Sequence, residues 1–286
     1  MAYKLLKGVD LAKNIKKDIQ TKISSFKKPL ILAIIQVGND QAAKLYAQRI
    51  DKMAVSIGVK TLNYYLDSSI TNIELVDLIK TLNENKEITG IFLLMPLPSH
   101  INKLEVISAI DHKKDIDCIS PINIGLMSTD SGIIFPSTPY AVMEILRSNN
   151  IEVARKECVI IGRSLVVGRP LATMMLSQNA TVTICHSYTK DLKSKVLRGD
   201  IVVAALGKEK FITADMIKPG AVVIDVGINI NENGNICGDI DFENVKEIAS
   251  YITPVPGGVG SVTVAILFKN LLSAYEAQEN SQRVLS

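Results

Sequence analysis

Stretches of apolar residues alternate with helical patterns of apolar and polar residues along most of the chain. In the first half, the segments 30–37, 59–66 and 90–95 are predicted to be strands, and Pro96 and Pro98 stop the third. Apolar strands separated by helices are typical of a parallel sheet that is covered on both faces.

The helices between these strands have recognisable ends. The segment 39–57 predicts a helix, and Gly58 is expected to close it as a C-terminal cap. The residues Thr71-Asn72-Ile73-Glu74 form a capping-box pattern, which predicts that a second helix opens there.

The second half of the chain repeats this alternation. Thr138-Pro139 predicts the start of a helix with proline at its first position, and this helix, ending near Asn150, is expected to connect two lobes. The layout that follows is typical of a doubly wound nucleotide-binding domain. It consists of short apolar runs at 157–161, 181–185, 201–206 and 221–226, separated by helical or loop segments.

The chain is therefore expected to be a two-lobed α/β protein. Its 286 residues suffice for one large domain or two of ordinary size, and 47 % hydrophobic residues suffice for a core. We predict an N-terminal α/β lobe at 1–137, joined by a C-terminal helix at about 264–286. The residues 138–263 are predicted to form a C-terminal, Rossmann-like, doubly wound lobe.

Composition argues against several classes of function. A net charge of +3, without a basic run, is too weak to indicate nucleic-acid binding. No apolar stretch reaches the roughly eighteen residues of a membrane span, and no apolar segment of a signal peptide is present. The cysteines are too widely spaced for a zinc site and suggest reduced thiols in a cytoplasmic protein. They are Cys118, Cys158, Cys185 and Cys237.

The segment after the predicted strand 157–161 suits a dinucleotide. Gly162 allows a tight turn, and the helix that follows Arg163 and Ser164 offers backbone N–H groups to a pyrophosphate. The spacing is not G-x-G-x-x-G, however, and a glycine turn between a strand and a helix is also ordinary structure.

The next strand, 181–185, favours NADP over NAD. NAD sites place a carboxylate at the tip of this strand to bind the ribose hydroxyls, whereas here Ser187 and Thr189 follow it. Hydroxyl groups and the guanidinium of Arg163 suit a 2′-phosphate. The alternative for both hydroxyl residues is helix capping before Asp191, and both roles are compatible.

Two more segments are candidates for lining a pocket. The residues 225–229 follow the last of the four apolar runs. The residues 253–260 contain two prolines and three glycines, which predicts a rigid loop whose backbone a ligand can approach closely. A tight structural loop is the alternative interpretation.

Taken together, these segments resemble the bifunctional methylenetetrahydrofolate dehydrogenase/cyclohydrolase (FolD) family. They occur in family order and span nearly the whole chain. The matching segments are VGNDQAAKLY (37–46), MPLP (95–98), KDID (114–117), PSTP (136–139), GRSLVVGRP (162–170), CHSYT (185–189), DVGIN (225–229), GDIDF (238–242) and PVPGGVG (254–260).

The resemblance implies a two-domain homodimer of one-carbon metabolism that holds tetrahydrofolate derivatives in a cleft against the nicotinamide lobe. It implies NADP-dependent oxidation of 5,10-methylenetetrahydrofolate to the methenyl form, followed in bifunctional members by hydrolysis to 10-formyltetrahydrofolate. The implied catalytic residues are Tyr46 and Asp117. The implied cofactor contacts are Gly162, Arg163, Ser164, Ser187 and Ile228. The implied folate contacts are Tyr46, Asp117, Pro256, Gly257, Gly258, Val259 and Gly260.

Two residues depart from the family pattern where it matters for the chemistry. The family has a lysine four residues after the tyrosine, one helical turn on, and here that residue is Ile50. The family has a glutamine two residues before Pro-Leu-Pro, and here that residue is Leu94. Smaller departures are Ala141 for a usual glycine, Ser120 for a frequent histidine, and Ser261-Val262 for Pro-Met.

The paired loss affects the two reactions differently. Hydride transfer depends mainly on alignment, whereas hydrolysis needs general acid–base catalysis. We therefore expect a dehydrogenase with weak or no cyclohydrolase activity. The alternatives are a bifunctional enzyme in which Arg49, Lys52 or a water replaces the lysine, and a silent folate- or NADP-binding protein. Arg49 lies about 100° around the helix from position 50 and is a poor acid–base group.

The two implied catalytic residues also have structural interpretations. Asp117 belongs to a charged segment with Asp111, Lys113, Lys114 and Asp115, and such charges are mostly solvated surface. The resemblance makes Asp117 a contact of the pterin amino edge instead. For Tyr46, the neighbours Ala42, Ala43 and Arg49 do not form an apolar stripe, which favours a cleft position over the core.

Overall fold

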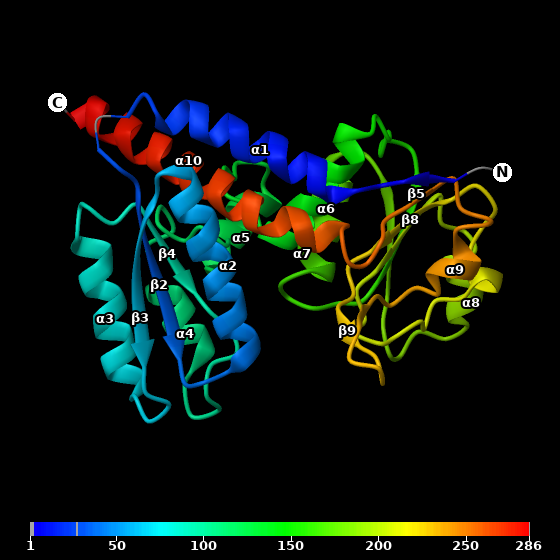
Figure 1. Cartoon of the computed structure of the whole chain (residues 1–286), viewed down its shortest axis with the longest axis horizontal. Coiled ribbons are helices and arrows are strands. Elements are labelled where there is room, and N and C mark those ends of the chain that lie inside the picture. Colours follow the sequence, from blue (N-terminus) through cyan, green and yellow to red (C-terminus); the bar gives the residue numbers. More distant parts are fainter. Residues whose placement is uncertain (1–2, 27, 286) are drawn as a thin grey trace. The chain divides into compact units, whose positions relative to one another are not determined.

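The computed structural model describes residues 3–26 and 28–285, with side-chain positions up to Asn280 in the last helix. The chain forms two compact units, drawn in Figure 1. The three-stranded unit comprises Ile15–Ser137 and Val264–Ser286, and the six-stranded unit comprises Met1–Asn14 and Thr138–Thr263. The first residues lie with the six-stranded unit because β1 (Lys4–Leu5) pairs in parallel with β11 (Tyr251–Ile252).

The sheet of the three-stranded unit is parallel and has the order β3-β2-β4. Its strands are β2 (Ile31–Val37), β3 (Lys60–Leu66) and β4 (Gly90–Leu93), which confirms the three predicted strands with small shifts at their ends. Because β3 and β4 lie on opposite sides of β2, the connection direction reverses between β2 and β4. Ligands of open parallel sheets bind at the carboxyl ends of the strands at such a reversal.

Helices α2 (Gln41–Ile57) and α3 (Asn72–Glu84) connect these strands. Both predicted helix ends are confirmed. Gly58 caps α2 with a φ of 81°, and Thr71 and Glu74 form a complete capping box on α3. Right-handed connections in opposite directions place the two helices on opposite faces of the sheet.

One face of this sheet packs against α3 and α4 (Lys103–Ala109). That core contains Ala33, Ile35 and Val37 from β2 together with Ile91 and Leu93 from β4. Side chains alternate between faces along a strand, so the other residues of β2 and β4 point toward the α2 face. The remaining helices of this unit include α5 (Pro121–Ser128) and parts of α1 (Gly8–Ile23) and α10 (Val259–Leu285).

The six-stranded sheet is parallel throughout, with the order β1-β11-β8-β7-β5-β6. The predicted runs correspond to β5 (Glu157–Ile161), β6 (Thr181–Cys185), β7 (Ile201–Ala204) and β8 (Val222–Asp225). Because β6 and β7 flank β5 on opposite sides, the reversal lies between β5 and β7. This order confirms the doubly wound class.

Short elements complete the six-stranded unit. Helix α7 (Gly168–Ser177) follows β5, and α8 (Leu192–Val196) follows β6. The small hairpin β9 (Asn229–Ile230) and β10 (Ile236–Cys237) follows β8, and α9 (Phe242–Val245) precedes β11.

Helix α6 (Ser137–Ser148) begins two residues earlier than predicted. Pro139 is therefore its third residue rather than its first. A proline is tolerated there because the first-turn N–H groups of a helix have no intrahelical acceptor.

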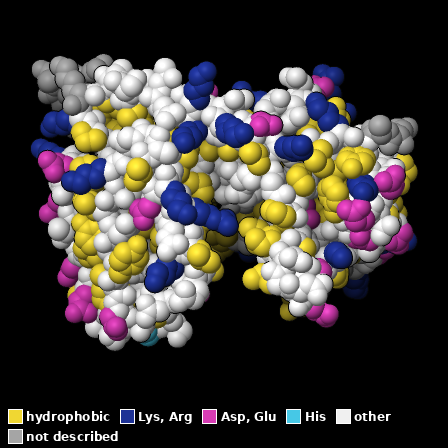
Figure 2. All heavy atoms as spheres, viewed as in Figure 1, with side chains coloured by type: hydrophobic (Ala, Val, Ile, Leu, Met, Phe, Trp, Pro, Cys, Tyr) yellow, Lys and Arg dark blue, Asp and Glu magenta, His cyan; other side chains and the backbone are white. Residues whose placement is uncertain are grey.

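Figure 2 shows Lys and Arg side chains interspersed with Asp, Glu and hydrophobic side chains on the face that it displays. Within the described part of the chain, no helix combines the length and the apolar character that a membrane span needs.

Candidate functional site

The turn after β5 lies at the reversal of the six-stranded sheet. Gly162 has a φ of 131°, and its N–H donates to the carbonyl of Cys185 at 2.9 Å. A Cβ at this position would overlap the carbonyl oxygen of Ala205, which follows β7. The glycine is therefore required by the close approach of the strand ends, in addition to its backbone conformation.

The same turn folds back onto the start of α7. A Cβ on Gly168, the first residue of α7, would overlap the carbonyl oxygen of Gly162. The hydroxyl oxygen of Ser164 accepts hydrogen bonds from the N–H groups of Val167 (3.1 Å) and Gly168 (3.4 Å). The hydroxyl oxygen of Ser164 thus shapes the turn as a hydrogen-bond acceptor. The same hydroxyl group is also suited to donate its proton to a phosphate oxygen.

The exposed Arg163 side chain comes from this turn and faces the segment after β6. Its guanidinium carbon lies 5.5 Å from the centroid of the Tyr188 ring, and Tyr188 is 80 % exposed. Ser187 is also exposed. A guanidinium and a hydroxyl at the ends of adjacent parallel strands match the donors that a phosphate group prefers.

Neither hydroxyl of this segment caps the next helix. Asp191 is the N-cap of α8 and accepts from the N–H of Ser194 at 3.4 Å. The hydroxyl of Thr189 instead accepts from the N–H of His186 at 2.8 Å and closes the segment on itself. Helix capping, the alternative interpretation of Ser187 and Thr189, is therefore wrong, because Asp191 takes that position.

Two buried carboxylates organise the segments after β7 and β8. Asp239 accepts hydrogen bonds from the N–H groups of Leu206, Gly207 and Lys208, at 2.5 to 3.1 Å, and from the Asn229 amide at 2.9 Å. It thereby ties the loop at the end of β7 to the hairpin after β8.

Asp225 supports the same arrangement from the end of β8. Its carboxylate accepts from the N–H groups of Gly227, Asp239 and Ile240 at 2.9 to 3.0 Å. Burial raises the pKa of Asp225 to about 6, while its backbone donors act in the opposite direction and the Asp239 charge adds to the rise. The DVGIN and GDIDF segments thus have a structural explanation, and no pattern in the sequence indicated that these carboxylates are buried together.

A Cβ on either nearby glycine would overlap these carboxylates. Gly227 lies against Asp239, and Gly238 lies against Asp225. The arrangement leaves Ile228, an implied cofactor contact, 66 % exposed.

The loop 254–260 packs tightly within the six-stranded unit. The N–H of Gly8, the first residue of α1, donates to the carbonyl of Gly257 at 2.8 Å. A Cβ on Gly258 would overlap the Pro254 carbonyl oxygen, and a Cβ on Gly260 would lie 3.8 Å from Ile228 Cδ1. The loop and the DVGIN segment are therefore neighbours.

The five implied folate contacts in this loop differ in exposure. Pro256 and Gly260 are exposed, Gly257 is half-buried, and Gly258 and Val259 are buried. Pro256 and Gly260 are therefore the most accessible of the five to a ligand.

Tyr46 lies on α2 in the three-stranded unit, beside an apolar stripe. Its ring meets Phe92 of β4 edge-on, with the centroids 5.9 Å apart, and is half-buried. The neighbours Ala42, Ala43 and Arg49 form no apolar stripe, since only Ala43 of the three is buried. Although Ala42 and Arg49 are exposed, the adjacent face of α2 is buried. That stripe consists of Ala43, Ala47, Ile50, Ala54 and Ile57.

The two departures from the family pattern are both buried. Ile50 is fully buried and Leu94 is 3 % exposed. Arg49 and Lys52, the residues considered as substitutes for a lysine at position 50, are exposed.

Asp117 is half-buried at the end of the KDID segment, and its Oδ1 accepts a 2.7 Å hydrogen bond from the hydroxyl of Ser137. Burial raises the pKa of Asp117 to about 6, the Ser137 hydrogen bond lowers it, and the nearby Asp115 charge raises it. A carboxyl with this pKa changes its charge close to neutral pH.

Of the charged residues before Asp117, Lys114 and Asp115 are not the solvated surface that their composition predicted, whereas Lys113 is exposed. Lys114 is buried and donates from Nζ to three carbonyls, at 2.6 to 3.0 Å. Asp115 is buried and accepts from the N–H groups of Ile119 and Ser120 and from the Asn123 amide. The carbonyls that Lys114 contacts belong to Leu82, Asn83 and Asn85, at the end of α3. These contacts fix the segment that carries Asp117.

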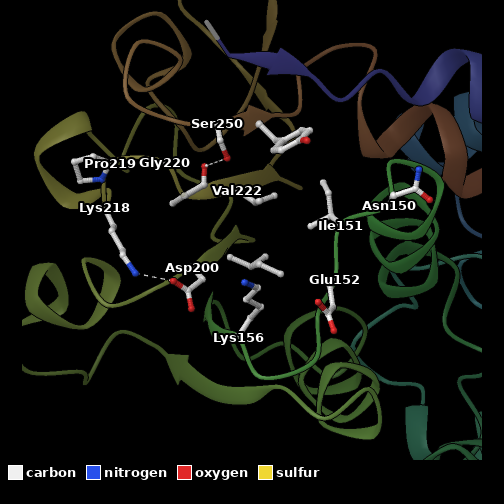
Figure 3. A pocket seen from close by; sticks show the side chains of 13 residues that line it. Asn150, Ile151, Glu152, Lys156, Asp200, Lys218, Pro219, Gly220, Val222 and Ser250 are labelled. Atoms are coloured by element: carbon white, nitrogen blue, oxygen red, sulfur yellow. Dashed lines mark hydrogen bonds and ion pairs between the residues drawn. The ribbon is translucent and has the colours of Figure 1, made fainter. Parts of the chain in front are cut away.

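A pocket of about 460 Å³ lies elsewhere, at the amino ends of β7, β8 and β11 (Figure 3). Its wall includes Lys156 and the ion pair of Lys218 with Asp200, whose atoms are 2.6 Å apart. None of its lining residues belongs to the motif segments. Among the described residues, no group of three or more His, Cys, Asp or Glu side chains is arranged to hold a metal ion.

Comparisons with known proteins agree with the fold of each unit. Residues 6–117 match the model of the tetrahydrofolate dehydrogenase/cyclohydrolase catalytic domain, and residues 136–279 match that of its NAD(P)-binding domain. The chain is 43 % identical over 281 residues to the bifunctional protein FolD of Acetivibrio thermocellus, which covers 97 % of this chain and 99 % of that protein.

Two solved structures extend the similarity to three dimensions. The bifunctional FolD enzyme of Campylobacter jejuni is 41 % identical, with a TM-score of 0.94 over 97 % of this chain and 100 % of that one. FolD of Trypanosoma brucei, solved with NADP cofactor and an inhibitor, is 34 % identical, with a TM-score of 0.91 over 96 % of this chain and 98 % of that one. This chain belongs to the tetrahydrofolate dehydrogenase/cyclohydrolase family.

Proposed function

We propose that this chain catalyses the NADP-dependent oxidation of 5,10-methylenetetrahydrofolate to 5,10-methenyltetrahydrofolate in one-carbon metabolism. The observation that carries this proposal is the intact turn at Gly162, Arg163 and Ser164, at the reversal of the six-stranded sheet. Family membership and the names of its relatives support the substrate.

The residues at this turn fit NADP. Arg163 and Ser187 supply exposed phosphate donors from the ends of β5 and β6, and no carboxylate stands in the segment 185–190 to repel a 2′-phosphate. Ile228 presents an exposed apolar surface for the coenzyme. NADP supplies a hydride acceptor, and the chain supplies its alignment.

On the folate side, Tyr46 and Asp117 are the proposed catalytic and substrate-binding residues, and the loop 256–260 contributes substrate contacts. The Asp117 carboxylate is suited to accept hydrogen bonds from the amino edge of the pterin, as its Ser137 contact uses only part of its acceptor capacity. Hydride transfer requires this alignment and stabilisation of an iminium-like cation, and no proton donor at that step.

We further propose that cyclohydrolase activity is weak or absent. The support is the burial of Ile50 and Leu94, because two aliphatic side chains in the interior cannot activate water or move a proton. A fully bifunctional enzyme is the alternative, in which Arg49, Lys52 or a water acts instead. A silent binding protein is the remaining alternative, and it predicts no turnover.

The homodimer and the cytoplasmic location belong to the same proposal. The dimer rests on the family resemblance, and light scattering of the purified protein tests it. The location rests on the four free thiols, of which Cys118, Cys158 and Cys185 are buried.

The experiment for the main activity is NADPH formation on addition of 5,10-methylenetetrahydrofolate to the purified protein with NADP. The matched variant is Arg163→Ala, which we expect to raise the KM for NADP about tenfold or more and to leave the KM for folate within about twofold. A protein that forms no NADPH contradicts the proposed function and supports the silent alternative.

A further inference from the structure

Gln36 of β2 is a buried polar residue with half of its amide unpaired. It is 3 % exposed, and its Nε2 donates to the carbonyls of Gly38 and Asp40, both at 3.3 Å. Its Oε1 has no hydrogen-bond partner among the described residues. The amide cannot be flipped to remedy this, because its oxygen would then face two carbonyl oxygens.

The register of the sheet places Gln36 beside Leu94. Ile35 pairs with Leu93, and the N–H of Leu94 continues the ladder by donating to the Ile35 carbonyl at 2.9 Å. The next pair along the two strands is therefore Gln36 with Leu94. Gln36 lies between Ile35 and Val37, which belong to the core on the α3 side of the sheet. Leu94 follows Leu93, which belongs to the same core. Because side chains alternate between the two faces of a sheet, Gln36 and Leu94 both point toward the α2 face.

This face carries the candidate folate residues of the three-stranded unit. Ile34 pairs with Phe92, one alternation before Gln36 and Leu94, and the Phe92 ring contacts Tyr46 of α2. Ile50, one turn after Tyr46, lies in the buried stripe of α2. Gln36 thus lies on the face where the family pattern has a lysine and a glutamine and where this chain has Ile50 and Leu94.

An unpaired buried carbonyl oxygen destabilises the free protein, and a donor from a ligand removes this cost on binding. Gln36 also lies near the carboxyl end of β2, at the reversal of the sheet, where ligands of parallel sheets bind. Its donors are already committed, so its available chemistry is that of an acceptor.

We propose that Gln36 is a substrate-binding residue of the folate side, whose amide stands in for the one that position 94 lacks. Its Oε1 accepts a hydrogen bond either from an N–H group of a bound reduced pterin or from one ordered water that in turn accepts from that N–H group. This inference rests on the proposed function for its ligand, and binding measurements test it independently of turnover.

The test is the variant Gln36→Met, which keeps the length of the side chain and removes the acceptor. We expect the Kd for tetrahydrofolate to rise about tenfold, with the KM for NADP within about twofold. The matched control is Gln278→Met in the same unit. Gln278 also donates from Nε2 to two carbonyls, those of Thr89 and Lys113, both at 2.9 Å. We expect this control to bind tetrahydrofolate as the unchanged protein does.

A relocation variant guards against misfolding. Gln36→Leu combined with Leu94→Gln moves the amide to the adjacent strand and should bind tetrahydrofolate more tightly than Gln36→Leu alone. Urea unfolding of each variant separates loss of binding from loss of stability. A crystal structure of the tetrahydrofolate complex with a pterin nitrogen or a bridging water at Oε1 supports the proposal and tells the two donors apart.

Unchanged tetrahydrofolate affinity in a folded Gln36→Met protein overturns the inference. Equal losses in Gln36→Met and Gln278→Met overturn it as well. If the unchanged protein binds tetrahydrofolate but forms no NADPH, the proposed function fails while the role of Gln36 is still decided by the Kd values.

Discussion

The hydroxyl of Ser137 donates a 2.7 Å hydrogen bond to Oδ1 of Asp117. This bond stabilises the ionised carboxylate, whereas burial, the stronger effect, raises the pKa of Asp117 to about 6. The charge of the proposed pterin contact is therefore set by opposing features of the fold.

This balance predicts an acid limb, that is, a decline at low pH, in the pH profile of kcat/KM for methylenetetrahydrofolate. If Asp117 binds the pterin as a carboxylate, kcat/KM for methylenetetrahydrofolate falls as the pH decreases through about 6, because Asp117 becomes protonated. The same profile measured for NADP at saturating folate should be flatter. A folate profile that is level between pH 5 and 7 contradicts this role.

The variant Ser137→Ala removes a bond that lowers the pKa of Asp117, so the acid limb should move to higher pH while kcat at pH 8 changes little. Ser148→Ala is the control on the same helix, since the Ser148 hydroxyl donates to the backbone carbonyl of Ile145 instead. Identical profiles for both variants argue against the Ser137–Asp117 coupling.

Gly162→Ala should damage both folding and coenzyme binding. The new Cβ overlaps the Ala205 carbonyl at a φ of 131°, which costs about 2 kcal/mol or more and displaces the turn. We expect NADP affinity to fall at least tenfold by titration. Gly234→Ala is the matched control, because Gly234 has a φ of 76° but open space around its Cα. A Gly162→Ala protein that binds NADP normally contradicts this account of the turn.

Asp239→Asn should loosen the loops after β7 and β8. Asp239 is fully buried, and an amide nitrogen in place of one oxygen would face backbone N–H donors, at a cost of about 3 kcal/mol. The expected result is a lower urea midpoint and a higher KM for NADP. Asp215→Asn, which alters an exposed ion pair with Lys193, should change the urea midpoint little. Equal stability of the two variants is the contrary outcome.

The fold was predictable because its signals are local. The strands at 157–161 and 181–185 coincide with apolar runs, and Gly58 and Thr71 mark helix ends by their own chemistry. The parallel, doubly wound order followed from that alternation.

The interior polar contacts were not predictable, because their partners are distant in the chain. Lys114 looks like a surface lysine, but its acceptors are about thirty residues earlier, at the end of α3. Asp225 and Asp239 are separated by the whole β9–β10 hairpin. Gln36 gave no signal, because only the sheet register places it beside Leu94.

Restoring the family residues should restore hydrolysis. The variant Ile50→Lys with Leu94→Gln introduces a proton-transfer group and an amide partner, and we expect methenyl hydrolysis to rise at least about tenfold. Val55→Lys is the control on the same helix, where the side chain is 79 % exposed. If the double variant folds and hydrolyses no faster than Val55→Lys, positions 50 and 94 do not limit the second reaction.

The most direct test of the proposed function follows NADPH and methenyltetrahydrofolate together after methylenetetrahydrofolate and NADP are added to the unchanged protein. The proposed function predicts that NADPH forms and that the methenyl absorbance accumulates in step, then decays at the rate measured without protein. It is contradicted if no NADPH forms, or if the methenyl compound decays at a rate that increases with protein concentration.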